Sequence, residues 1–228
     1  MHPFVIDLDA AAATDSGLVG AKAARLAALR QAGFPVPDGF VVPAEVFRTA
    51  PHGEVTPDVE AEIAAAYGSL GDQARVVIRS SVVQPQGAVA AAAGAFASFR
   101  GIAGVGMIVR HIERCWQSAT GPAAQVYYDQ AGVEPDQVAL AVLVQVVVEA
   151  DASGVVLALG DRRNNQLPTT GQATIPALTP SQAGELARLG DGVREHFGEP
   201  QQIEWVSQGD QWWIVQVYPV SASPGSAG

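Results

Sequence analysis

The spacing of apolar and polar residues follows two different patterns along this chain, and the pattern changes near residue 136. In the first part, apolar residues recur at helical spacing and predict helices over residues 16–31, 43–50, 55–70, 105–119 and from Pro122 onward. Short apolar runs between them predict strands at residues 1–9, 39–42 and 76–78. In the second part, the pattern predicts strands over 138–148 and 155–159, a helix over 180–197 capped by Thr179, and a hairpin of residues 202–206 and 212–217.

This order of elements predicts an α+β chain with two lobes. We expect a helical N-terminal lobe over residues 1–135, a strand-rich C-terminal lobe over 136–221 and a flexible tail over 222–228. Residues 84–94 are rich in alanine and glycine, which fits an ordered loop or a mobile lid, and residues 161–176 are polar enough for a loop. A binding site is expected in the cleft between the two lobes.

Composition narrows the classes of partner. With 48% hydrophobic and 16% charged residues, the chain fits a compact globular protein. A net charge of −10 without a basic patch argues against nucleic acid or an anionic membrane as the main partner. The longest apolar run, residues 138–148, is interrupted by Gln145 and is too short to span a bilayer.

The single cysteine and the N-terminus bear on the compartment. Cys115 cannot form an internal disulfide and lies in an apolar helical pattern beside Trp116, which predicts a buried structural thiol. The N-terminus lacks the basic and long apolar regions of a signal peptide. We therefore expect a cytoplasmic protein.

Lys22 is the first candidate for chemistry, because it is the only lysine among 13 basic residues. It follows Gly20 near a probable helix start, where backbone N–H groups and the helix dipole favour anions. An ammonium on a flexible stem suits a phosphate contact. From spacing alone, a solvated lysine on an amphipathic helix is the other interpretation.

Arg79 is the second candidate, because it places a charge at the expected end of an apolar strand, before Ser80 and Ser81. An arginine at a strand end that opens onto a cleft can bind a phosphate with two N–H groups. A salt bridge to an acidic neighbour explains the same pattern equally well.

Glu204 and Gln216 are the third candidates, since they interrupt otherwise apolar strands of the terminal hairpin. Carboxylate and amide oxygens are suitable ligands for Mg²⁺. A turn centred on Gly209 places Ile214 opposite Glu204 and puts Gln216 on the same face, whereas a turn centred half a residue earlier puts Gln216 on the other face. Two polar groups facing solvent are the alternative.

These candidates lie within longer motifs. The motifs are GAKAARL at residues 20–26, GFPVPDGFVV at 33–42, VIRSS at 77–81, CWQS at 115–118, Gln145 with DASGV at 151–155, IEW at 203–205 and VQVYPV at 215–220. In this order they resemble the nucleotide-binding domain of the phosphoenolpyruvate synthase and pyruvate phosphate dikinase family, which includes rifampin phosphotransferase. The resemblance reaches from about residue 16 to residue 221, and residues 33–42 are its most specific part.

The resemblance implies an ATP-grasp fold and a set of roles. Lys22 and Arg79 would contact ATP phosphates, Gln145 would belong to the nucleotide-binding residues, and Glu204 and Gln216 would hold Mg²⁺ on one face of the hairpin. In the family, a phosphoryl group from ATP passes to a histidine on a separate swivelling domain and then to an acceptor.

The chain also departs from the family pattern. Alanine replaces the polar and acidic residues of the family's lid, Tyr218 stands where the family usually has an arginine, and residues 161–176 replace a longer segment. None of His2, His52, His111 and His196 lies in a context that resembles the phosphorylated histidine.

Two functions follow. One is an ATP-binding subunit that acts with a separate phosphohistidine-bearing protein; the other is a catalytically degenerate relative that binds a partner or another ligand. We expect Lys22, Arg79, Glu204 and Gln216 to converge on one cleft.

Overall fold

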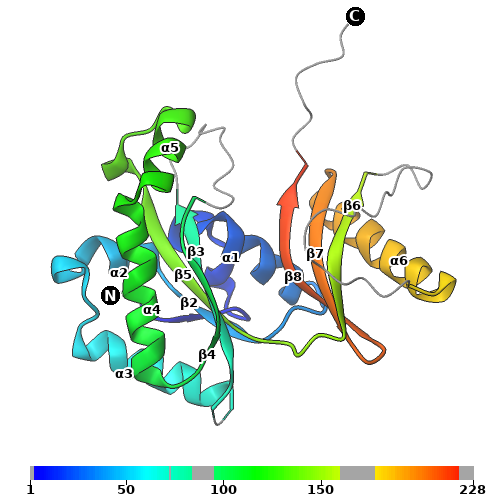
Figure 1. Ribbon diagram of the computed structural model, residues 1–228, viewed down its shortest axis with the longest axis horizontal. Coiled ribbons are helices and arrows are strands. Elements are labelled where there is room, and N and C mark those ends of the chain that lie inside the picture. The colour runs from blue at the N-terminus through cyan, green and yellow to red at the C-terminus, as the bar shows by residue number, and fades with distance from the viewer. Residues whose placement is uncertain (1–2, 72, 84–94, 160–177, 221–228) are drawn as a thin grey trace, which may run out of the picture. The chain divides into compact units, whose positions relative to one another are not determined.

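The computed structural model describes residues 3–71, 73–83, 95–159 and 178–220. Two compact units make up the chain (Figure 1). The first contains residues 1–32 and 37–147, and the second contains residues 33–36 and 148–228. The backbone therefore passes between the units three times, after Ala32, Val36 and Val147.

An antiparallel five-stranded sheet forms the centre of the first unit. Its strands lie in the order β1-β2-β5-β3-β4. β5 is central and runs antiparallel to both β2 and β3. The strands are β1 (Ile6–Asp7), β2 (Gly39–Val42), β5 (Ala139–Val146), β3 (Val76–Val83) and β4 (Ser98–Ile102).

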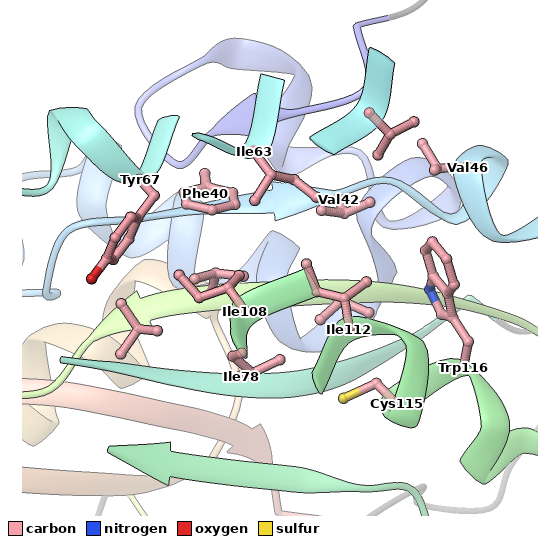
Figure 2. Packing of buried hydrophobic residues seen from close by; sticks show 14 of the residues in the cluster. Phe40, Val42, Val46, Ile63, Tyr67, Ile78, Ile108, Ile112, Cys115 and Trp116 are labelled. Atoms are coloured by element: carbon pink, nitrogen blue, oxygen red, sulfur yellow. The ribbon is translucent and has the colours of Figure 1, made fainter. Parts of the chain in front are cut away.

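Helices cover both faces of this sheet, which explains its continuous apolar strands. The even-numbered residues of β2, β3 and β5 pack with α3 and α4 in a core that includes Ile78, Ile63 and Ile112 (Figure 2). The odd-numbered residues of β3 face α1, as the contact between Ser81 and Ala23 shows. The helices are α1 (Ser16–Gln31), α2 (Ala44–Thr49), α3 (Pro57–Ser69), α4 (Val105–Gln117) and α5 (Pro122–Ala131), with short 3₁₀ turns η1 (Ala11–Thr14), η2 (Pro51–Gly53), η3 (Ser118–Thr120) and η4 (Pro135–Gln137).

The second unit is a three-stranded antiparallel sheet with one helix among its described residues. β6 (Ala152–Ala158), β7 (Gln201–Gln208) and β8 (Gln211–Pro219) follow each other in the sheet, and α6 (Pro180–Phe197) packs on one face. Thr179 caps α6 through the Gln182 backbone N–H, with Gln182 bonding back to Thr179, as the sequence predicts.

A short stretch from the N-terminal part of the chain belongs to this second unit. The backbone N–H of Ile214 in β8 donates to the carbonyl of Pro35 at 2.7 Å. The Phe34 ring lies edge-on to His196 with centroids 5.9 Å apart, and it also lies against Gly192. Residues 33–36 thus contact both β8 and α6.

The structure differs from the sequence prediction in four places. β5 lies in the first unit, so the units divide after Val147, whereas the sequence placed the lobe boundary between residues 135 and 136. The first unit is accordingly not only helical. Arg79 is not at a strand end, because β3 continues to Val83. β4, an edge strand containing Arg100 and Gly101, has no clear strand pattern and was not predicted.

Some predictions fall on residues that the structure does not describe. The loop or lid at residues 84–94, the loop at 161–176 and the tail after 221 all lie outside the described residues. Within the described part of the chain, no helix is long and apolar enough to cross a membrane. The α+β class itself is confirmed.

Candidate functional site

Gly20 divides α1 and creates a second helix start directly before Lys22. Its backbone is not helical, with φ of +76° and ψ of 158°, a conformation open to glycine and strained for other residues. A Cβ at Gly20 would lie 2.5 Å from the backbone of Ser81 in β3. Glycine therefore allows the chain to turn and approach β3 at this point. Lys22 lies in the first turn after the break, at the positive end of the remaining helix.

Ser81 fixes this helix start on the sheet. Its Oγ accepts a hydrogen bond from the backbone N–H of Ala23 at 3.1 Å. A hydroxyl from another element thus satisfies one of the N–H groups that a helix start leaves without a helical partner. Lys22, the residue before Ala23, is held on the face of β3 that also carries Arg79.

Arg79 and Gln145 form a buried polar pair on this same face. Arg79 is 9% exposed and Gln145 is 1% exposed. The guanidinium Nη1 of Arg79 donates to Oε1 of Gln145 at 3.4 Å. Nε2 of Gln145 donates in turn to the carbonyl of Pro37 at 3.2 Å. The first unit therefore brings Arg79 and Gln145 into contact and holds the helix start beside Lys22 against Ser81, two residues along β3 from Arg79.

A β-bulge in the terminal hairpin decides where Gln216 points. The turn is Gly209–Asp210, since Gln208 pairs with Gln211. A regular ladder from this turn would place Val215 opposite Glu204. The register shifts between Glu204 and Trp205, so that Gln216 is directly opposite Glu204.

Glu204 and Gln216 consequently share one face of the sheet, because cross-strand partners point to the same side. Neither of the two registers weighed from sequence is present, although the expected common face is. Tyr218 also lies on this face, and its hydroxyl donates a hydrogen bond to Oε1 of Gln216. Trp205, the next residue of β7, points to the opposite face with α6 and is fully buried.

The donor set of this face fits a hard divalent cation in part. The Glu204 carboxylate and the remaining lone pair of the Gln216 oxygen are oxygen ligands of the kind that Mg²⁺ prefers. Among the described residues, no group of three or more His, Cys, Asp or Glu side chains gathers as a metal site. A bound Mg²⁺ would therefore need further oxygens, such as those of a nucleotide phosphate or water.

Two residues of the DASGV segment have structural roles that the sequence did not reveal. Oδ2 of Asp151 accepts from the backbone N–H of Gly209 at 2.7 Å and so holds the hairpin turn. Gly154 lies against the Trp205 indole, where a Cβ would approach Cζ2 to 2.8 Å. Their proximity to the hairpin depends on strand pairing, which their spacing in the sequence does not show.

Cys115 is structural, as the sequence predicts. It is fully buried in the core of the first unit. Burial raises the pKa of its thiol to about 11, so the thiolate needed for nucleophilic chemistry is scarce near neutral pH.

Comparison with known protein families identifies the family of this chain. The chain matches the family described as pyruvate phosphate dikinase, AMP/ATP-binding domain, over residues 49–175 and 159–227. It belongs to this family. The resemblance noted from the sequence is thereby confirmed. Lys22 lies before the matched residues, whereas Arg79, Gln145, Glu204 and Gln216 lie within them.

The relatives of this pyruvate phosphate dikinase domain have names that give different functions, and they are longer than the chain. They include prodigiosin synthesizing transferase PigC of Serratia marcescens, 25% identical over 97% of this chain and 34% of the relative. A rifampicin phosphotransferase from Streptomyces sp is 27% identical over 95% of this chain and 36% of its own length. A probable phosphoenolpyruvate synthase of Archaeoglobus fulgidus is 26% identical, covering 91% and 40%. The chain thus spans little more than a third of these relatives.

The solved structures that are similar to this chain include one whose name includes bound ATP and one whose name includes the ATP-grasp fold. One is D-alanine–D-alanine ligase from Bacillus anthracis complexed with ATP, with a TM-score of 0.48, 6% identity and coverage of 93% of this chain and 57% of the other. Another is a RimK domain ATP-grasp protein from Sphaerobacter thermophilus, with a TM-score of 0.45, 19% identity and coverage of 93% and 63%.

Lys22, Arg79 and Gln145 lie in the first unit, and Glu204 and Gln216 lie in the second. Convergence of the two groups on one cleft stays a prediction.

Proposed function

We propose that this chain binds ATP with Mg²⁺ and serves as the nucleotide-binding part of a phosphotransferase. Membership of an AMP/ATP-binding domain family supports this proposal. The observation that carries it is the break at Gly20, which places Lys22 at a helix start held by Ser81, on the sheet face that carries Arg79. An ammonium, a guanidinium and the positive end of a helix are complementary to a polyphosphate.

Glu204 and Gln216 would hold Mg²⁺, with nucleotide phosphates supplying further ligands. The metal would offset phosphate charge. Phosphoryl transfer would then use an acceptor histidine on a separate component, as the family resemblance implies. The rifampicin phosphotransferase and phosphoenolpyruvate synthase relatives are much longer, which leaves room for such a component outside this chain.

Tyr218 favours a second candidate function, a degenerate scaffold without catalysis. Its hydroxyl already occupies one lone pair of the Gln216 oxygen, at a position where the family resemblance leads one to expect an arginine. Losing one charged contact to a transferring phosphoryl group costs on the order of 3 kcal/mol of transition-state stabilisation. Nucleotide binding with little turnover is therefore the expected behaviour of the isolated chain.

Calorimetric titration with ATP, with and without Mg²⁺, tests the proposal. Wild type should bind ATP more tightly with Mg²⁺, and Lys22→Ala should weaken binding about tenfold in both conditions, as loss of one charged hydrogen bond implies. Glu204→Ala should remove the Mg²⁺ dependence and keep metal-free binding. Glu199→Ala, at an exposed carboxylate in the same unit, is the matched control. No binding by the wild type at millimolar ATP would favour the scaffold function.

A further inference from the structure

The CWQS segment at residues 115–118 ends in a serine that bonds to another element. Oγ of Ser118, directly after α4, accepts a hydrogen bond from the backbone N–H of Ala97 at 3.1 Å. The Ser118 hydroxyl donates its own proton to the carbonyl of Cys115 at 2.6 Å. Because that proton is committed to the helix end, the oxygen is left with its lone pairs for Ala97. Ser118 therefore ties the end of α4 to the residue that precedes β4.

The carbonyl of Ala97 is held by β3. It accepts from the backbone N–H of Ser80 at 3.2 Å and from the Ser80 hydroxyl at 3.1 Å. The buried thiol of Cys115 lies 3.6 Å from the same oxygen. Both polar backbone groups of Ala97 are thus bonded to serines from other parts of the first unit. Since hydrogen bonds are directional, these contacts fix both the place and the orientation of this residue.

Rings on either side of Ala97 hold the chain close to two helices. Phe96 lies edge-on to Tyr127 of α5 with centroids 5.4 Å apart, and Phe99 lies edge-on to His111 of α4 at 4.7 Å. Apolar packing of this kind is not directional, so it keeps the segment near the helices without setting its register. The hydrogen bonds at Ala97 are therefore the contacts that determine where β4 begins to pair with β3.

This starting point decides which side chain lies beside Arg79. Ser98, the first residue of β4, pairs with Arg79, and cross-strand partners share a face of the sheet. A slip of β4 by one residue would bring Ala97 or Phe99 opposite Arg79 instead. The anchor at Ala97 thus keeps a small hydroxyl side chain next to the candidate phosphate ligand, where a slipped strand would place a methyl group or a large ring.

We propose that Ser118 is a positioning residue, which together with Ser80 holds Ala97 and so keeps Ser98 in register with Arg79. The inference rests on the proposed function, because Arg79 is a candidate phosphate ligand there. It makes two separable claims. Ser118 sets the start of β4 in the free protein, and the effect of Ser118 on ATP passes through the surroundings of Arg79.

The first claim is tested by NMR without nucleotide. Ser118→Ala should accelerate exchange of the Ala97 amide with water about tenfold, in line with loss of one hydrogen bond. It should also weaken the backbone NOEs between Ser98 and Arg79 and shift the Arg79 side-chain ¹⁵N signal, which is assigned from Arg79→Met. Ser118→Thr keeps the hydroxyl and should restore all three measurements.

Ser69→Ala is the matched control for these spectra. The Ser69 hydroxyl also donates to a carbonyl of its own helix, that of Ala65 at 3.3 Å, and the hydrogen bond described for it stays within α3. This variant should leave the signals of Ala97 and Arg79 unchanged. Unchanged Arg79 signals and NOEs in Ser118→Ala overturn the proposal, whether or not ATP binds.

The second claim is tested by titrating ATP and adenosine into the same variants. Ser118→Ala should weaken ATP binding about three- to tenfold and change adenosine binding less than about twofold, because only the phosphates would meet Arg79. Ser118→Thr should bind ATP like the wild type. In an Arg79→Met background, adding Ser118→Ala should cost less than about a further twofold. Equal losses for ATP and adenosine, or additive losses in the double variant, would contradict an effect through Arg79. If the wild type binds no ATP, the proposed function fails while the NMR result still decides the register claim.

Ser80→Ala covers the case in which Ser118→Ala does not fold. It removes the hydroxyl donor to the Ala97 carbonyl but keeps the backbone N–H donor, so the same changes should appear at about threefold instead of tenfold. Ser81→Ala is its control, because the Ser81 hydroxyl holds Ala23 and its loss should leave Ala97 exchange unchanged. Faster Ala97 exchange in Ser80→Ala with unchanged Arg79 signals would again overturn the proposal.

Discussion

Gly20 shows how one residue without a side chain organises the region around Lys22. The backbone needs a positive φ there, and the helix must also approach Ser81 more closely than any Cβ allows. These two demands select glycine independently. The neighbouring lysine thereby gains a helix start that a continuous helix would not provide.

Gly20→Ala should therefore lower the free energy of unfolding by about 2–4 kcal/mol, from backbone strain and the clash with Ser81 together. Urea denaturation measures it. Gly68→Ala is the control, because Gly68 lies in α3 with nothing within 4 Å of a built Cβ, and this change should be neutral or stabilise by up to about 1 kcal/mol. Equal effects of the two substitutions would contradict the role assigned to Gly20.

If Glu204 and Gln216 hold Mg²⁺, as proposed, Tyr218 is a residue that should affect metal binding, because its hydroxyl donates to the Gln216 oxygen. Tyr218→Phe removes the hydroxyl that donates to Gln216, so the amide oxygen gains a free lone pair. The ratio of the ATP affinity with Mg²⁺ to the ATP affinity without Mg²⁺ should therefore rise about three- to tenfold. Tyr218→Arg should instead strengthen metal-free ATP binding through added positive charge. Calorimetry at several Mg²⁺ concentrations separates the two effects. Identical titrations for wild type and Tyr218→Phe would show that the hydroxyl does not compete with the metal.

Among the elements, the four-residue segment 33–36 makes contacts with two elements of the second unit, α6 and β8. Phe34 packs on α6 and Pro35 bonds to β8, so four residues connect the helix and the sheet edge of the second unit. The two prolines at positions 35 and 37 keep this stretch extended.

Phe34→Ala should destabilise the second unit by about 2 kcal/mol, less than a fully buried phenylalanine because the ring is half-buried. Tryptophan fluorescence during urea denaturation reports it, since Trp205, Trp212 and Trp213 all lie in that unit. His196→Ala keeps the Phe34 ring and its packing on Gly192 while it loses the edge-on contacts of the imidazole with Phe34 and Phe197, so it should cost less than half as much. If His196→Ala costs as much stability as Phe34→Ala, the packing of the Phe34 ring on α6 is not the main stabilising contact.

Prediction from sequence worked where local signals determine an element and failed where pairing does. The helix over residues 16–31 follows its apolar spacing, and Thr179 before Pro180 marks the start of α6. By contrast, the bulge that brings Gln216 opposite Glu204 depends on the two strands together, and no residue pattern announces it. Likewise, Arg79 ends the apolar run of β3 but not the strand, and the hydrogen bond that it donates to Gln145 across the sheet cannot be read from either segment alone. Lys22, Arg79, Glu204 and Gln216 were found from local patterns and Gln145 through the family motifs, while their partners required the structure.

At the scale of the whole molecule, the open question is whether the two groups of site residues act on one ligand. If they do, ATP must bridge them, with phosphates near Lys22 and Arg79 and a metal near Glu204 and Gln216. Mn²⁺ provides a paramagnetic substitute for Mg²⁺ that broadens nearby amide signals in NMR spectra.

With Mn²⁺ and ATP together, amide signals of Ala23 and Ser81 in the first unit should broaden along with those of β7 and β8. With Mn²⁺ alone, broadening should stay near Glu204, because the phosphates that bring the groups together are missing. Glu204→Ala should abolish the broadening that Mn²⁺ alone produces and serves as the control. Broadening confined to β7 and β8 even with ATP would mean that the two groups do not share a ligand.

The hydrogen bond between Pro35 and Ile214 also sets an order of events during synthesis on the ribosome. Its partners are about 180 residues apart, a stretch that takes roughly 10–40 s to translate at typical rates. Phe34 has no α6 to pack on until residue 197 has been made, and Pro35 has no β8 partner until residue 214 has been made. The first unit can complete its sheet as soon as β5 emerges, but the second must wait for β8 and then take up a segment made near the beginning. The nascent chain thus carries the apolar segment 33–36 without its β8 contact until that strand has been made.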